Sequence, residues 1–138
     1  MLDVTQEDGP FDAVLSVHAL HHVGDPAAVL PHVRSLLAPG GRLVVADIID
    51  LGAWSNRSFH IERVVNSVRT VYWLAADGDA AADVLRLLLH PRWLRLTRTD
   101  VPPTRDAFHT AYEEVFPGVV LTDDLHPMMC GAVWCAPS

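Results

Sequence analysis

The apolar positions between residues 11 and 49 form two nearly continuous runs, separated by a longer stretch with helical spacing. Residues 11–17 (FDAVLSV) and residues 43–49 (LVVADII) are short and almost wholly apolar, as in parallel strands that are covered on both faces. Only Asp47 interrupts the second run. The connection between the runs is as long as a right-handed parallel crossover requires, so the pattern predicts a strand–helix–strand unit.

The connecting helix has a start signal and an end signal. Asp25 offers an N-cap acceptor, and Pro26 has a preset φ that suits the first helical position. We expect Gly40 and Gly41 to end the helix, because a left-handed residue is needed there. One apolar stripe would lie on the sheet: Val29, Leu30, Val33, Leu36 and Leu37.

The middle of the chain has helical periodicity. Apolar spacing predicts helices over about 57–75 and 80–89, and Thr104 is an N-cap for a third helix. The prolines between residues 91 and 103 indicate an irregular connector. Aromatic residues fall in or beside the first two helices, where helical spacing favours a core over a substrate pocket: Trp54, Tyr72, Trp73 and Trp93.

Two short runs near the end of the chain, 119–123 and 128–135, predict strands, and the short turn between them favours an antiparallel pair. Cys130 and Cys135 are five positions apart on the second of these strands, which places them on opposite faces. We expect two buried free thiols rather than a disulfide or a metal pair.

Composition narrows the class of protein. The 138 residues suffice for about one domain, and half of them are apolar. The net charge of −7 argues against nucleic acid as a partner, because phosphate binding needs a basic face. No apolar run is long enough to span a bilayer, and the first ten residues are acidic and polar, so we expect a cytoplasmic protein without membrane contact. All ten basic residues are arginine, which is typical of a GC-rich bacterial genome.

The phrases FDAVLSVHALHHV and DPAAVLPHVRSLLAPGGRLVVAD resemble the middle of class I S-adenosylmethionine-dependent methyltransferases, especially the small-molecule type 11 group. The ending FPGVVLTDDLHPMMCGAVWCAP is similar to the closing antiparallel pair of that family. The resemblance implies an α/β fold with an incomplete Rossmann-like sheet, in which parallel strands end in an antiparallel pair. Residues 1–138 would then be a partial methyltransferase domain, with residues 51–115 as a variable helical insertion.

The resemblance also implies a cofactor, S-adenosyl-L-methionine, and residues that contact it. Asp3 and Val4 stand where an acidic side chain meets the adenine amino group and an apolar neighbour packs the ring, although Asp3 is equally well interpreted as a solvated residue near the terminus. Ser16, Val17 and His18 follow the strand whose backbone lines the methionine portion of the cofactor. Ligands generally bind at the carboxyl ends of parallel strands, which agrees with this placement.

The catalytic candidates are weaker. His18 is a candidate general base, but methyl transfer from a sulfonium depends on positioning and does not require one. Asp47, at the end of its strand, would either orient a substrate or hydrogen-bond to the backbone. We expect no metal site, because His18, His21 and His22 lack the sequence context of zinc hydrolases.

The family's glycine-rich turn, of the kind E/DxGxGxG, does not occur in this sequence. In the family's sheet order the strand at 11–17 would pair with a strand that precedes that turn. We therefore expect an open apolar edge at 11–17, marginal stability as a monomer, and pairing of this edge with another chain. Three interpretations remain: part of a methyltransferase for a small-molecule acceptor, a half-domain completed by another chain, or an inactive fragment.

Overall fold

The computed structural model describes residues 8–23, 26–52, 57–99 and 101–138. The chain divides into two compact units. Residues Met1–Leu51 and Pro102–Ser138 form one of them, which we call the sheet unit, and Gly52–Val101 form the other, the helical unit. Among the described residues, no helix is long and apolar enough to cross a membrane.

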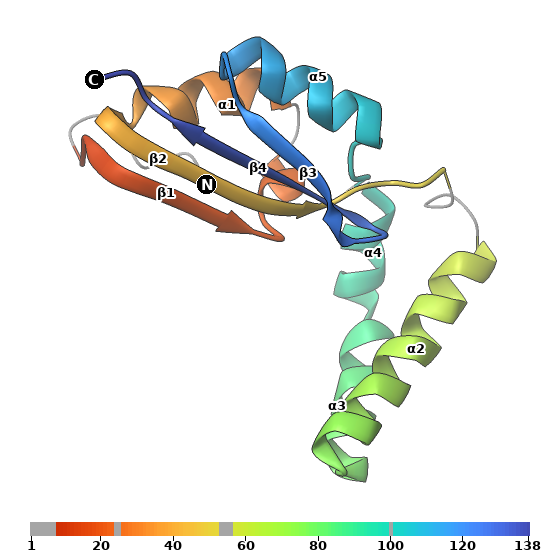
Figure 1. Cartoon of the computed structure of the whole chain (residues 1–138). Coiled ribbons are helices and arrows are strands. Elements are labelled where there is room, and N and C mark those ends of the chain that lie inside the picture. Colours follow the sequence, from red (N-terminus) through yellow and green to blue (C-terminus); the bar gives the residue numbers. More distant parts are fainter. Residues whose placement is uncertain (1–7, 24–25, 53–56, 100) are drawn as a thin grey trace. The chain divides into compact units, whose positions relative to one another are not determined.

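The sheet unit is built on one four-stranded sheet with the order β1-β2-β4-β3 (Figure 1). β1 and β2 are parallel, whereas β4 is antiparallel to both β2 and β3. This arrangement confirms the predicted α/β class, with parallel strands that end in an antiparallel pair. The strands are β1 (Phe11–Val17), β2 (Leu37–Ile48), β3 (Val120–His126) and β4 (Met129–Cys135).

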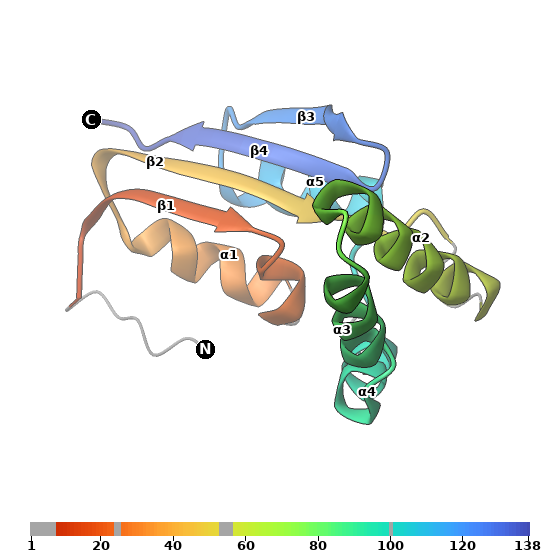
Figure 2. The ribbon, with the colours of Figure 1, turned by 90° about the horizontal axis from the view of Figure 1, so that it is seen from below.

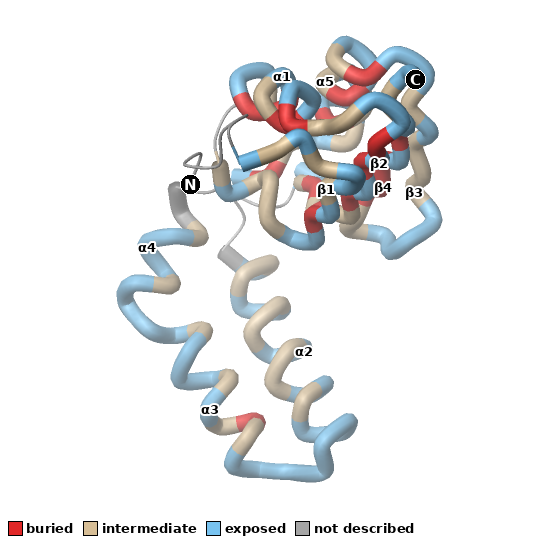
Figure 3. The backbone as a smooth tube through the Cα atoms, turned by 90° about the vertical axis from the view of Figure 1, so that its left-hand side faces the viewer, coloured by how far each residue is buried: buried red, intermediate tan, exposed pale blue. Residues whose placement is uncertain are grey.

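Two helices, α1 (Pro26–Ser35) and α5 (Arg105–Val115), lie on the same face of this sheet (Figure 2). Leu30 of α1, Leu43 of β2 and Phe116 after α5 are almost completely buried between the two layers. The ring of Phe116 lies 5.1 Å from that of Trp134 on β4, and Phe108 stacks on Tyr112 at 4.3 Å. Apolar burial of this kind is the main source of stability in a small domain. The buried positions of the sheet unit fall mainly on α1, α5, β2 and β4 (Figure 3).

The opposite face of the sheet carries exposed aliphatic side chains. Leu15 pairs with Val44, Val44 with Val133, and Val133 with Val120, so one row crosses all four strands. All four side chains are exposed, Leu15 to 72%. The prediction that these strands are covered on both faces is therefore wrong for the described residues, in which only one face is packed.

The prediction that Gly40 and Gly41 end the first helix is wrong. α1 ends at Ser35, and both glycines lie within β2. The pairing of β1 with β2 shifts at this point, so that Ala38 to Gly41 form a bulge. Gly40 has a φ of +73°, and a Cβ on Gly41 would lie 2.8 Å from the carbonyl oxygen of Ala38. The glycines are needed for this bulge and not for a helix end.

The helical unit contains α2 (Arg57–Ala75), α3 (Gly78–Leu88) and α4 (Pro91–Thr99). The first two confirm the predicted helices, and the carboxylate of Asp77 caps α3 by accepting from the backbone N–H groups of Asp79 and Ala80. The irregular connector predicted from the prolines is wrong, because α4 lies there. Pro91 starts that helix, at the position where a preset φ is favourable and no N–H is needed.

The helix capped by Thr104 is α5, as predicted. It belongs to the sheet unit. The compact helical unit, Gly52–Val101, is therefore shorter than the helical insertion expected over residues 51–115. The two cysteines are free, but only Cys130 is buried. The expectation of two buried thiols fails at Cys135, which lies on the uncovered face because successive residues of β4 alternate between faces.

Candidate functional site

The carboxyl ends of β1 and β2 lie side by side and carry four of the predicted site residues. Ser16 pairs with Val45 and Val17 with Ala46, immediately before Asp47. The hydroxyl oxygen of Ser16 is buried and has no hydrogen-bond partner among the residues that the structure describes. A buried hydroxyl without a partner costs roughly 1–3 kcal/mol, which is the kind of cost that functional sites retain. Val17 points to the other face and is exposed.

His18 turns the chain away from the end of β1. Its φ of +52° lies in the left-handed region, and its backbone N–H donates to the carbonyl oxygen of Ala46 at 2.9 Å. The side chain is exposed, and its Nε2 lies 3.3 Å from the Sδ of Met129. Left-handed backbone in a residue other than glycine is uncommon and is frequently found at binding sites.

Asp47 is buried and accepts three hydrogen bonds. One of its carboxylate oxygens accepts from the backbone N–H of His21 at 2.9 Å, and the other lies 2.5 Å from the Nδ1 of the same histidine. The second oxygen also accepts from the backbone N–H of Ile48 at 2.9 Å. Asp47 therefore ties the short 3-10 helix η1 (Leu20–Val23), which follows β1, to the end of β2. This role of His21 could not be predicted from local patterns, because the two partners are 26 positions apart and no short-range spacing connects them.

The negative charge of Asp47 acts on its surroundings. Burial, and secondly the charge of Asp47, raise the pKa of Tyr112 on α5 far above its ordinary value. The space between these groups is about 20 Å³, which suits roughly one water molecule and not a substrate. The carboxylate of Asp47 thus faces the core and orders the loop after β1.

Asp3 and Val4, the predicted adenine contacts, lie outside the described residues, as do Asp25 and Trp54. Tyr72 and Trp73 are exposed, contrary to a core role. Trp93 lines a pocket of about 390 Å³ within the helical unit, between α2, α3 and α4. Its wall is mainly aliphatic, and it includes Arg63, whose pKa is lowered by burial.

Known proteins resemble this chain in both sequence and fold. Residues 2–99 match the model of a family described as a methyltransferase domain. A ubiquinone biosynthesis O-methyltransferase of Xylella fastidiosa (strain M23) is 44% identical over 45 residues, which are 33% of this chain. The match spans only 18% of that relative's length.

Solved structures resemble most of the chain. A possible exported protein from Bordetella parapertussis has a TM-score of 0.53 at 19% identity, and the match covers 93% of this chain and 39% of that one. This likeness concerns the fold alone. A structure of the CurJ carbon methyltransferase matches 93% of this chain and 30% of that one, with a TM-score of 0.48 and 23% identity. Because the family match extends over well more than half of the sequence, the chain belongs to the methyltransferase domain family.

Proposed function

We propose that this chain forms part of an S-adenosylmethionine-dependent methyltransferase that acts on a small-molecule acceptor. The observation that carries the proposal is the buried hydroxyl of Ser16, without a partner among the described residues, at the carboxyl end of a parallel strand. This is the position where ligands bind in open α/β sheets. The relative from Xylella fastidiosa is named for an O-methyltransferase of ubiquinone biosynthesis, which supports a small-molecule acceptor.

The residues have separate tasks in this proposal. When bound, S-adenosylmethionine supplies an electrophilic methyl group on a sulfonium, and displacement at such a carbon depends mainly on alignment. The backbone of Ser16, Val17 and His18 lines the ligand, and the Ser16 hydroxyl gives it a hydrogen bond. The exposed imidazole of His18 accepts the proton of the acceptor group. Asp47 is a positioning residue. Its hydrogen bonds to His21 hold the loop that comes after His18.

A partner strand at β1 belongs to the same proposal. β1 is the end strand of the sheet, and among the described residues no strand pairs with its outer edge. Leu15, Val44 and Val133 are exposed on the uncovered face beside it. An apolar edge and an apolar face next to each other favour association with a segment that adds both a strand and a covering layer. The glycine-rich turn that this sequence lacks would come with that segment.

Calorimetric titration with S-adenosylhomocysteine tests the proposal. The chain alone is expected to bind at about millimolar affinity or weaker, because part of the site is missing. A chimaera tests the completed site: the part of the Xylella fastidiosa relative that precedes its matched segment is fused to this chain from the aligned position onward. The chimaera is expected to bind at about micromolar affinity.

The hydroxyl of Ser16 is tested in the same chimaera. Ser16→Ala should weaken binding about tenfold, the cost of one hydrogen bond of roughly 1.4 kcal/mol. Ser35→Ala is the matched control, because the Ser35 hydroxyl donates to the carbonyl oxygen of His32 on the exposed side of α1. A folded chimaera that does not bind would refute the proposed function. Micromolar binding by the chain alone as a monomer would refute the claim that its site is incomplete.

A further inference from the structure

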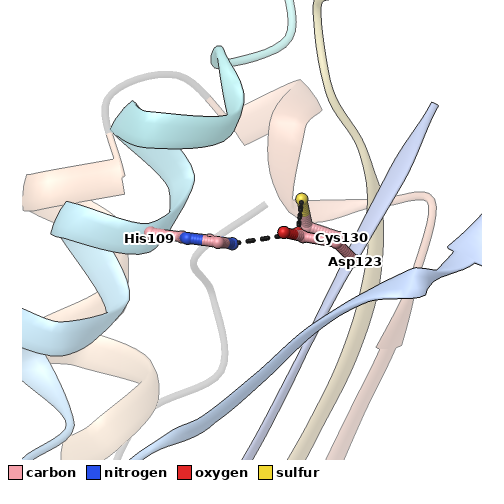
Figure 4. A group of neighbouring side chains, drawn as sticks. All are labelled: His109, Asp123 and Cys130. Carbon is pink, nitrogen blue, oxygen red and sulfur yellow. Dashed lines mark hydrogen bonds and ion pairs between the residues drawn. The ribbon is translucent and has the colours of Figure 1, made fainter. Parts of the chain in front are cut away.

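A second polar cluster lies in the sheet unit, outside the site described above. It consists of His109 on α5, Asp123 on β3 and Cys130 on β4 (Figure 4). The Sγ of Cys130 donates to an oxygen of Asp123 at 3.1 Å, and the Nε2 of His109 lies 3.0 Å from the same oxygen. One side-chain atom from each residue lies within 4.8 Å of the other two.

The surrounding structure fixes these three groups. Cys130 is completely buried between the sheet and α5, whereas the side chains of His109 and Asp123 are each about one-third exposed. The cluster is therefore anchored in the core and open to solvent on one side. The guanidinium of Arg105, one turn before His109 on α5, holds the other oxygen of Asp123 at 2.9 Å. A ligating carboxylate is commonly fixed in this way by a second hydrogen-bonding group.

The three residue types point to one class of ligand. Thiolate, imidazole and carboxylate together are the ligands of zinc and similar divalent transition metals, whereas calcium and magnesium prefer oxygen alone. We propose that His109, Asp123 and Cys130 bind one zinc ion or a similar transition-metal ion, with a fourth position open to solvent. The ion takes the place of the two hydrogen bonds that now converge on one oxygen of Asp123, and the thiol proton of Cys130 leaves to water.

This assignment differs from the expectation that the chain has no metal site. That expectation concerned the histidines near His18 and the pair of Cys130 and Cys135, whereas His109, Asp123 and Cys130 come from three separate elements. Cys135 is exposed and lies on the other face of β4, so it is not a ligand.

Cobalt(II) and zinc titrations of the full chain, first stripped of metal with a chelator, test the proposal. One cobalt ion per chain is expected to produce a near-ultraviolet thiolate-to-cobalt charge-transfer band, which zinc then abolishes by displacement. Cys130→Ser should remove the band, and Cys135→Ser, the matched control, should leave it unchanged. The proposal would be overturned if the wild-type chain showed no band. It would also be overturned if Cys135→Ser lost the band while Cys130→Ser kept it.

A second variant keeps the proposal testable if the Cys130→Ser chain does not fold. His109→Gln changes a partly exposed helix residue and should keep the far-ultraviolet circular dichroism of the wild type. It is expected to weaken cobalt binding at least tenfold. A folded His109→Gln chain with unchanged affinity would refute the assigned ligand set. These readouts do not depend on methyl transfer, so they can fail or succeed independently of the proposed function.

Discussion

The sheet unit encloses a core of apolar side chains between its sheet and its two helices, whereas the helical unit leaves most of its large apolar side chains exposed. Leu30, Leu43 and Phe116 are nearly inaccessible in the first unit. In the described part of the second, Ala81 is the one buried apolar side chain, and Trp73 and Leu74 are 74% and 84% exposed. Each unit contains a helix with a side-chain N-cap, Thr104 for α5 and Asp77 for α3. The difference shows that helical periodicity is sufficient to form helices, but that a core needs a second layer of comparable area.

The two units should differ most in how much stability is lost when one large apolar side chain is truncated to alanine. Phe116→Ala should destabilise the chain by about 3–5 kcal/mol, because it leaves a cavity next to Trp134. Leu74→Ala should change stability by less than about 0.5 kcal/mol, because the side chain is already in water. Urea unfolding of both variants gives the two values. Similar losses would show that the helical unit has a core of its own.

The two units also differ in how much one aspartate side chain contributes to stability. Asp47→Ala should cost about 2–3 kcal/mol, because His21 and two backbone N–H groups lose a buried acceptor. Asp83→Ala removes an exposed partner of Arg86 on α3 and should cost less than about 0.5 kcal/mol. The comparison is again made by urea unfolding. An equal cost for the two variants would contradict the role assigned to Asp47.

Alkaline pH tests the buried position of Tyr112 in the sheet unit. Burial raises the pKa of Tyr112 in the folded state above the ordinary value of 10.0, so the fold favours the protonated phenol. Its contribution to stability is complete below about pH 10 and is lost as the pH rises further, by about 1 kcal/mol at about pH 11. Tyr112→Phe should flatten this decline, whereas Tyr72→Phe in the helical unit should leave it unchanged. Thermal unfolding between about pH 8 and 11 measures the effect.

The smallest expected effect is a gain. Ser16→Ala removes a buried hydroxyl that has no partner among the described residues, so the free chain should become more stable by roughly 0.5–1 kcal/mol. The same change weakens ligand binding in the proposal above. Removal of this one oxygen atom would then raise the stability of the free chain and lower its affinity for the ligand. A loss of stability in Ser16→Ala would indicate that the hydroxyl has a structural partner.

The strands and most of the helices could be predicted because their signals are local. Apolar runs, Thr104 as a cap and the spacing of the last two strands each depend on a few neighbouring residues. The bulge at Gly40 and Gly41 could not be predicted, because it depends on how close β1 comes to β2. Pro91 was misread for a related reason, since a proline breaks a helix or starts one according to its position.

The candidate site also contains residues that could be predicted from the sequence and contacts that could not. Ser16 and His18 were predicted from the resemblance to the methyltransferase family, and Asp47 was predicted because it lies at the end of its strand. His21 was missed as the partner of Asp47, and the cluster of His109, Asp123 and Cys130 was missed entirely. These contacts join residues that are distant in sequence or lie on different elements, and only the register of the folded sheet brings them together.

The exposed row of Leu15, Val44, Val133 and Val120 determines when the chain can associate with a partner that covers it. Its members come from four strands, so the row exists only after β1, β2, β3 and β4 have paired in register. A partner that covered this row would bind the folded sheet and would find no equivalent surface on the unfolded chain. Complete burial of an exposed aliphatic side chain contributes about 1.5–3 kcal/mol, so Leu15 and Val120 would gain more than the half-covered Val44 and Val133. The stability of the sheet should therefore rise with the concentration of whatever covers it, so that folding and association are one coupled equilibrium.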